Sequence, residues 1–228
     1  MLEIGSSSDF QFTVARTSQS PFPLAVILSK QLSTLNMSTF LKENLREDFY
    51  IRLFFDTKNG FYKAGLKRAY LDFNRTLKNE KSQTERNLIQ KETQNFLENH
   101  LKILAETKFK SQSEFDEEHK KLCEILTKQW NELKIGQAQK WINMTLKYWL
   151  LFGENRINGI ELNAKYFHIP IDSYVQKGMF EEKNPKAWSK ISDYQTYLNY
   201  QIKHREKKSG NFPILDEFEF FNNYNPKK

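Results

Sequence analysis

Polar side chains interrupt one strongly apolar stretch of the sequence, and they are the first candidates for chemistry. Between Trp141 and Phe152 apolar residues fall on nearly every face of a helix, which is typical of a helix buried on most sides. An amine, amide or hydroxyl on such a helix needs a polar partner or a function, because burying it alone is costly. Four polar side chains lie on this helix or just before it: Lys140, Asn143, Thr145 and Lys147.

Two helix starts frame this part of the chain. Gly136 lies where one helical pattern ends and the next begins, and Lys140 follows it closely. Further along, Pro170 precedes Asp172 and Ser173, and either of these two side chains could cap the exposed N–H groups of a following helix. The sequence therefore puts an amine and a carboxylate near two separate helix starts, 32 positions apart.

These two helix starts resemble a known family. The residues Gly-Gln-Ala-Gln-Lys from Gly136 to Lys140 are similar to the Gly-x-Gly-x-Lys hairpin motif of the helix-hairpin-helix DNA glycosylases, the 8-oxoguanine glycosylase group in particular. The segment 169–175, Ile-Pro-Ile-Asp-Ser-Tyr-Val, is similar to the family's Val-Pro-Val-Asp segment. The resemblance covers about a fifth of the chain. The stretch also resembles uncharacterised bacterial proteins with an Ala-Gln-Lys helix followed by a Pro-x-Asp turn.

The sequence departs from the family pattern at several positions. Ala138 replaces the second glycine of the hairpin motif, Lys134 and Ile135 stand where the family has Pro-Gly, and Tyr174 replaces a histidine. The interval between the lysine and the aspartate is longer than in the family, and an insert at 153–165 could account for it.

The resemblance implies a reaction at a DNA sugar that needs no cofactor. The amine of Lys140 would attack the sugar carbon of a nucleotide flipped out of the duplex and form a Schiff base. Asp172 would stabilise the positive charge that develops on the sugar. Backbone N–H groups at the hairpin, around Lys134, Gly136 and Gln137, would bind a DNA phosphate. In the simpler interpretation, Lys140 is solvated and Asp172 is only a helix cap.

Side chains near Asp172 could form a base pocket. Tyr174 and Trp188 could stack on a flipped base, and His168 could reach the same cleft. The alternative is that these rings simply fill the core of a chain with 14% aromatic residues.

Basic residues concentrate on one predicted helix, which spans about 62–77. Lys63, Lys67 and Arg68 lie outside its apolar stripe, where they could track DNA phosphates. The net charge of +7, from 35 basic and 28 acidic residues, favours a polyanionic partner. An ordinary solvated helix face would show the same pattern.

Helical periodicity runs from Met37 to Tyr224, and strand signals are few. We therefore predict an all-α, multi-helix globular domain over residues 37–228, with a helix-hairpin-helix-like unit. Residues 1–36 are rich in Ser and Thr and lack this periodicity, so we interpret them as a disordered tail or as sequence upstream of the natural start.

Composition excludes several classes of protein. The single cysteine, Cys123, rules out an intrachain disulfide framework and a cysteine-ligated cluster, and it fits a reducing cytoplasm. The apolar run Pro21–Leu28 is too short to span a bilayer, so we expect no membrane association. The four histidines lack metal-ligand spacing, so we predict no metal site: His100, His119, His168 and His204.

Two functions remain compatible with the sequence. One is a DNA repair or phage-defence enzyme of glycosylase type that uses Lys140 and Asp172. The other is a non-catalytic helical protein, regulatory or anti-phage, that binds nucleic acid or protein. The sequence leaves the oligomeric state and the excised base open.

Overall fold

The computed structural model describes residues 45–78, 81–208 and 210–223. The chain divides into two units between Tyr50 and Ile51, and all helices from Phe61 onward belong to the second unit. Residues 45–54 are helical. The predicted domain boundary between residues 36 and 37 lies outside the described residues.

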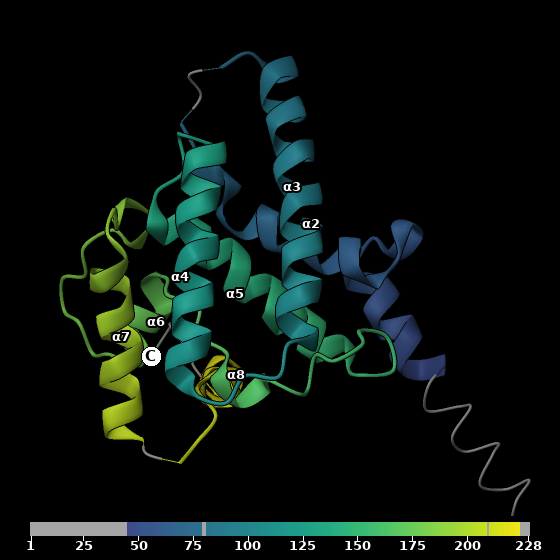
Figure 1. Ribbon diagram of the computed structural model, residues 1–228. Coiled ribbons are helices and arrows are strands. Elements are labelled where there is room, and N and C mark those ends of the chain that lie inside the picture. The colour runs from purple at the N-terminus through teal and green to yellow at the C-terminus, as the bar shows by residue number, and fades with distance from the viewer. Residues whose placement is uncertain (1–44, 79–80, 209, 224–228) are drawn as a thin grey trace, which may run out of the picture. The chain divides into compact units, whose positions relative to one another are not determined.

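Every regular element in the described ranges is helical, which confirms the predicted all-α fold (Figure 1). The α-helices of the second unit are α2 (Phe61–Phe73), α3 (Gln83–Glu106), α4 (Gln112–Gln129), α5 (Ile135–Phe152), α6 (Ser173–Gly178), α7 (Tyr194–Lys207) and α8 (Pro213–Asn223). One short 3₁₀ helix, η1 (Thr57–Asn59), precedes α2, and three lie between the α-helices: η2 (Asn74–Thr76), η3 (Ala164–Tyr166) and η4 (Trp188–Lys190).

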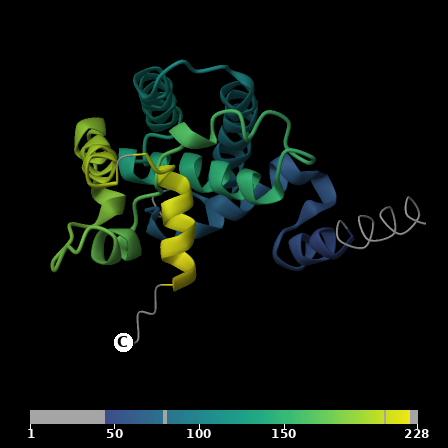
Figure 2. The same ribbon diagram turned by 90° about the horizontal axis from the view of Figure 1, so that it is seen from below.

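Helix α5 is the centre of the second unit. It packs against α2, α3, α4 and α7, and Figure 2 shows it in the middle of these helices, with the yellow α8 crossing in front. Fifteen of its 18 residues are buried, as the apolar pattern on nearly all its faces predicts. Any polar side chain on α5 therefore meets protein rather than water.

A glycine in the interior of α2 allows α2 and α5 to pack closely. A Cβ atom on Gly65 would lie 2.6 Å from Cδ1 of Trp149, so only glycine fits there, although glycine weakens a helix interior. The indole N–H of Trp149 donates to the carbonyl of Tyr62 (3.0 Å), and that of Trp141 donates to the carbonyl of Leu66 (3.2 Å). These contacts fix the rotation of α5 about its axis, and hence the direction of its polar side chains.

Candidate functional site

Lys140 lies in the second turn of α5, and its side chain is only 6% exposed. The rest of this turn is also buried, because α5 is covered by helices on most sides. The interpretation of Lys140 as a solvated lysine is therefore wrong. A buried ammonium group needs an acidic partner, and the structure provides one.

Asp172 is the N-cap of α6 and the partner of Lys140. Its Oδ1 accepts hydrogen bonds from the backbone N–H groups of Tyr174 and Val175, both at 2.9 Å. Its Oδ2 accepts from Nζ of Lys140 at 2.6 Å. One oxygen of the Asp172 carboxylate thus caps the start of α6, and the other binds the amine of Lys140.

The contact between Lys140 and Asp172 is short, and the two side chains differ in their exposure to solvent. A contact of 2.6 Å between Nζ and Oδ2 is a short, charge-assisted hydrogen bond. The side chain of Asp172 is 22% exposed and that of Lys140 only 6%, so solvent reaches the carboxylate more than the amine. The amine is held by protein, and the carboxylate faces both protein and solvent.

A second lysine–carboxylate pair lies two turns further along α5. Nζ of Lys147 contacts Oε2 of Glu217 on α8, and both side chains are buried. Nζ also lies 4.8 Å from the ring centre of Phe218 and 4.9 Å from that of Phe221. Burial lowers the pKa of Lys147, Glu217 raises it, and the charge of Lys140 lowers it further. The two amines therefore influence each other electrostatically.

A third carboxylate, that of Asp72 on α2, forms a hydrogen bond to a side chain of α5. Oδ2 of Asp72 accepts a hydrogen bond from the hydroxyl of Tyr148 on α5 at 2.7 Å. Burial raises the pKa of Asp72, and the Tyr148 hydroxyl and the charge of Lys140 oppose that rise. Helix α2, which carries Asp72, packs against α5, which carries Lys140.

The basic residues predicted on α2 are exposed. Lys63, Lys67 and Arg68 all reach solvent. Nζ of Lys67 pairs with Asp56 at 2.8 Å, and Arg68 lies 3.9 Å from Asp72 one turn later. Two of these three basic side chains are thus paired with carboxylates, and all three belong to the helix that carries Asp72.

The hairpin differs from the prediction of exposed amides. The N–H of Gly136 donates to the carbonyl of Ile191 at 3.0 Å, and a Cβ atom on Gly136 would lie 1.8 Å from the carbonyl oxygen of Trp188. Gln137 is also buried, and its side-chain amide donates to Thr76. Only Lys134 of the three predicted hairpin residues is exposed. Chain from the η4 region thus occupies the place where the sequence predicts a phosphate.

The three predicted base-pocket residues have different environments. Tyr174 is 52% exposed and lies in the first turn of α6, next to Asp172. Trp188 is half-buried, and its carbonyl packs on Gly136. His168 is fully buried, with hydrogen bonds to other side chains, which corrects its assignment to an open cleft.

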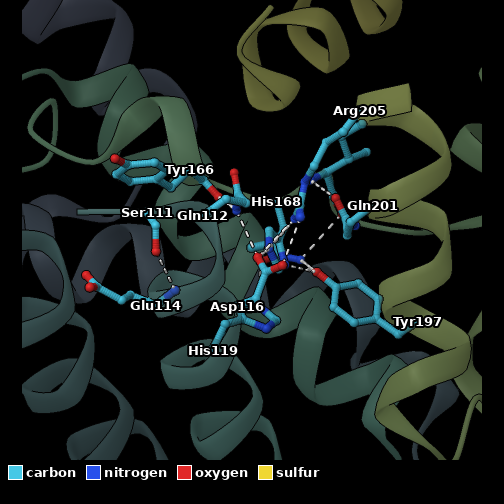
Figure 3. Close-up of polar contacts among 12 residues, drawn as sticks. Ser111, Gln112, Glu114, Asp116, His119, Tyr166, His168, Tyr197, Gln201 and Arg205 are labelled. Atoms are coloured by element: carbon cyan, nitrogen blue, oxygen red, sulfur yellow. Dashed lines mark hydrogen bonds and ion pairs between the residues drawn. The ribbon is translucent and has the colours of Figure 1, made fainter. Parts of the chain in front are cut away.

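His168 belongs to a buried polar network between α4 and α7. Figure 3 shows Asp116, His168, Arg205 and Tyr197 pointing toward one another. Arg205 donates two hydrogen bonds to the Asp116 carboxylate (2.8 and 3.0 Å), and Nε2 of His168 contacts the same carboxylate at 2.7 Å. Nδ1 of His168 lies 2.8 Å from the hydroxyl of Tyr197.

The charges in this network are set by burial and by its hydrogen bonds. Burial alone would raise the pKa of Asp116, but the hydrogen bonds from His168 and Arg205 outweigh it and hold the pKa well below its ordinary value. Burial lowers the pKa of His168, which Asp116 opposes. Burial also lowers the pKa of His119, whose Nε2 contacts Oδ1 of Asn143 at 2.9 Å. Nδ2 of Asn143 also donates to the hydroxyl of Tyr197 at 2.8 Å, so the network reaches α5 through Asn143.

Sequence reasoning missed Asp116, His119 and Arg205 as parts of a buried network. His119 had a usable signal, because it lies one turn after Phe115 on the apolar stripe of α4, where a polar residue needs a partner. Asp116 had none, because its early position in the helix is where acidic residues are common on solvated faces.

Among the described residues, no cluster of three or more His, Cys, Asp or Glu side chains is arranged to hold a metal ion. No helix in the same ranges has the length and apolar character needed to cross a lipid bilayer. Cys123 is a free, buried cysteine and packs as a small core residue. Comparison of the chain with protein families, curated proteins and solved structures gives no match.

Proposed function

We propose that the protein binds DNA and acts on a deoxyribose of the bound strand through Lys140, in the manner of the helix-hairpin-helix glycosylases. One observation carries the proposal. An amine at the start of one helix contacts a carboxylate that caps another, with Nζ of Lys140 2.6 Å from Oδ2 of Asp172. This is the pair that the resemblance implies, and its members lie 32 positions apart in the sequence.

The chemistry needs an uncharged amine and a negative group beside the sugar. A proton must leave Lys140 before attack, and Oδ2 of Asp172 is within hydrogen-bond distance to accept it. The amine nitrogen then bonds to C1′ of the sugar while the bond from C1′ to the base breaks, and the base leaves with the electron pair. The leaving base takes this proton from Asp172 as its bond to C1′ breaks, so Asp172 is again a carboxylate and stabilises the positive charge on the sugar adduct. The C1′–O4′ bond then breaks while a proton passes from the amine nitrogen to O4′, which opens the sugar ring and gives the Schiff base.

The charge distribution supports DNA as the partner. The net charge is +7, and Lys63, Lys67 and Arg68 lie exposed on α2, which packs against the helix that carries Lys140. Exposed lysine and arginine on one helix can neutralise several phosphates of a strand. Tyr174 is exposed beside Asp172, and we expect its ring to stack on a displaced base. The single free cysteine is consistent with a cytoplasmic location.

Borohydride capture tests the proposal. The protein is incubated with duplexes that carry an abasic site or one of a panel of damaged bases, and borohydride reduces any Schiff base to a stable amine. Wild type should form a covalent adduct on at least one duplex, and Lys140→Ala should form none. Lys147→Ala is the matched control, because it removes a second buried, paired lysine from the same helix. Equal capture by Lys140→Ala and wild type would refute the proposal.

A specific observation favours the second candidate, a non-catalytic helical protein that binds nucleic acid or another protein in a regulatory or anti-phage role. The amide of Gly136 already donates to Ile191, and Trp188 fills the space beside Gly136. A closed hairpin is poorly suited to a phosphate. DNA binding by wild type without capture on any duplex would favour this candidate, with Lys140–Asp172 as a structural pair.

A further inference from the structure

One segment of the second unit is buried although it belongs to no helix. Residues 167–171 have no regular secondary structure, so their backbone N–H and C=O groups need partners from elsewhere in the protein. Two glutamine side chains supply them. Gln201 of α7 accepts from the N–H of Ile169 (3.0 Å) and donates to its carbonyl (2.8 Å). Gln139 of α5 accepts from the N–H of Ile171 (3.2 Å) and donates to its carbonyl (2.9 Å).

The side-chain amide of Gln139 has no hydrogen-bonding capacity left. Its Nε2 also donates to the carbonyl of Gly136 at 2.8 Å, and its Oε1 also accepts from Nδ2 of Asn143 at 3.0 Å. A primary amide offers two donors and two acceptor positions, and all four are used here. Gln139 is fully buried. The amide therefore cannot turn over without losing hydrogen bonds that water could not replace.

The position of Gln139 in the sequence connects it to the candidate site. Gln139 directly precedes Lys140, and Ile171 directly precedes Asp172. We infer that Gln139 is a positioning residue, which holds the backbone at Ile171 so that the carboxylate of Asp172 meets the amine of Lys140. Its role in catalysis rests on the proposed function of Lys140, whereas its effect on the ion pair does not.

Such positioning matters because the proposed reaction depends on distance. A misplacement of about 1 Å in a reacting group can cost on the order of a hundredfold in rate. Gln201 makes the same pair of hydrogen bonds two residues earlier, but it does not directly precede a member of the pair. Gln201 is therefore a matched control for Gln139, because both bind the backbone of the segment 167–171 and only Gln139 adjoins the Lys140–Asp172 pair.

The first test measures the ion pair without any DNA. The full-length protein is treated with an acylating reagent, and mass spectrometry gives the labelling rate of each lysine in wild type, Gln139→Met and Gln201→Met. Methionine keeps the length of glutamine and removes its amide. Labelling of Lys140 should rise about tenfold in Gln139→Met, the effect of one or two lost net hydrogen bonds, and less than about twofold in Gln201→Met. An equal change in both variants, or none in Gln139→Met, would overturn the inference.

A second measurement needs no variant, so it remains decisive if Gln139→Met does not fold. Hydrogen exchange followed by NMR in the wild type should show the N–H of Ile171 exchanging as slowly as the amides of α5. The exposed turn residue Lys183 is the fast reference. Exchange of Ile171 as fast as that of Lys183 would mean that Gln139 does not hold this backbone.

Borohydride capture then connects positioning to the reaction. With DNA at saturating concentration, Gln139→Met should be captured about tenfold more slowly than Gln201→Met, while the DNA concentration that gives half the maximal rate stays unchanged. If wild type forms no adduct, the proposed function fails, and the labelling experiment still decides the positioning. If wild type forms an adduct and Gln139→Met matches Gln201→Met in both labelling and capture, the positioning is wrong and the function stands.

Discussion

Replacing Asp172 by asparagine should separate the two roles of this side chain. Oδ1 of Asp172 caps α6 and Oδ2 accepts from Lys140. Asparagine caps a helix about as well as aspartate, so Asp172→Asn keeps the cap. It removes the negative charge and leaves the ammonium group of Lys140, which is only 6% exposed, beside a neutral amide. We expect the variant to fold and to be less stable than wild type.

The expected loss follows from the burial of the two groups. Removing one member of a buried ion pair costs about 3–5 kcal/mol, and the 22% exposure of Asp172 puts the expected value near the lower end, at about 3 kcal/mol. Asp172→Ala also removes the cap and should cost about 1 kcal/mol more. Combining Lys140→Met with Asp172→Asn removes both charges, and the double variant should lose only about 1 kcal/mol, since replacing a whole buried pair is often close to neutral.

Urea unfolding followed by tryptophan fluorescence measures these differences, because Trp141 and Trp149 are buried on α5 and become exposed on unfolding. The comparison of the two single variants with the double variant gives the coupling between Lys140 and Asp172. A loss below about 1 kcal/mol for Asp172→Asn is typical of an exposed pair and would refute the reasoning. A double variant that loses as much as the sum of the single variants would refute it as well.

Three further predictions concern the hairpin, the buried histidines and the DNA interface. Gly136→Ala should lower the free energy of unfolding by about 3 kcal/mol and lower the melting temperature, because the new Cβ would lie 1.8 Å from the carbonyl oxygen of Trp188. An unchanged melting temperature would mean that η4 does not cover the hairpin. Burial lowers the pKa of His119, so it stays neutral in the folded protein while the unfolded chain takes up a proton near pH 6.5. The free energy of unfolding should therefore fall as the pH drops below about 6.5, by up to about 1.4 kcal/mol per pH unit, and His119→Gln should show a shallower slope in denaturant titrations at several pH values. Lys63→Ala should weaken DNA binding and reduce the slope of log affinity against log salt by about 1, measured by fluorescence anisotropy; an unchanged slope would remove Lys63 from the interface.

Much of the helical fold was predictable because its signals are local. The apolar pattern from Trp141 to Phe152 predicts a buried helix, and α5 is one. The pattern Ser-x-x-Glu at residues 111–114 is typical of a capped helix start, and the hydroxyl of Ser111 accepts from the N–H of Glu114 at 3.2 Å. The reciprocal bond of a full capping box runs instead from the N–H of Lys110 to the Glu114 carboxylate (2.7 Å). Local patterns thus locate a helix start but do not determine every bond around it.

The candidate site was predictable only in part, because its remaining parts depend on contacts between distant segments. The contact between Lys140 and Asp172 follows from the resemblance, and the structure contains it. The burial of Gly136 does not follow from its neighbours, since the covering chain comes from the η4 region, more than 50 positions later. The burial of the His168 side chain was not predictable either. Successive side chains of an extended segment point to opposite sides, and the sequence alone does not tell which side faces the core.

The most direct test of the account is to identify the residue that carries the reduced DNA adduct. Wild type is captured with borohydride on a duplex with an abasic site, digested with protease and nuclease, and sequenced by tandem mass spectrometry. The account predicts one modified lysine, Lys140, with Asp172→Asn giving the same site at a lower yield. An adduct on Lys134, Lys147 or the terminal amine, or no adduct on DNA that the protein demonstrably binds, would contradict it.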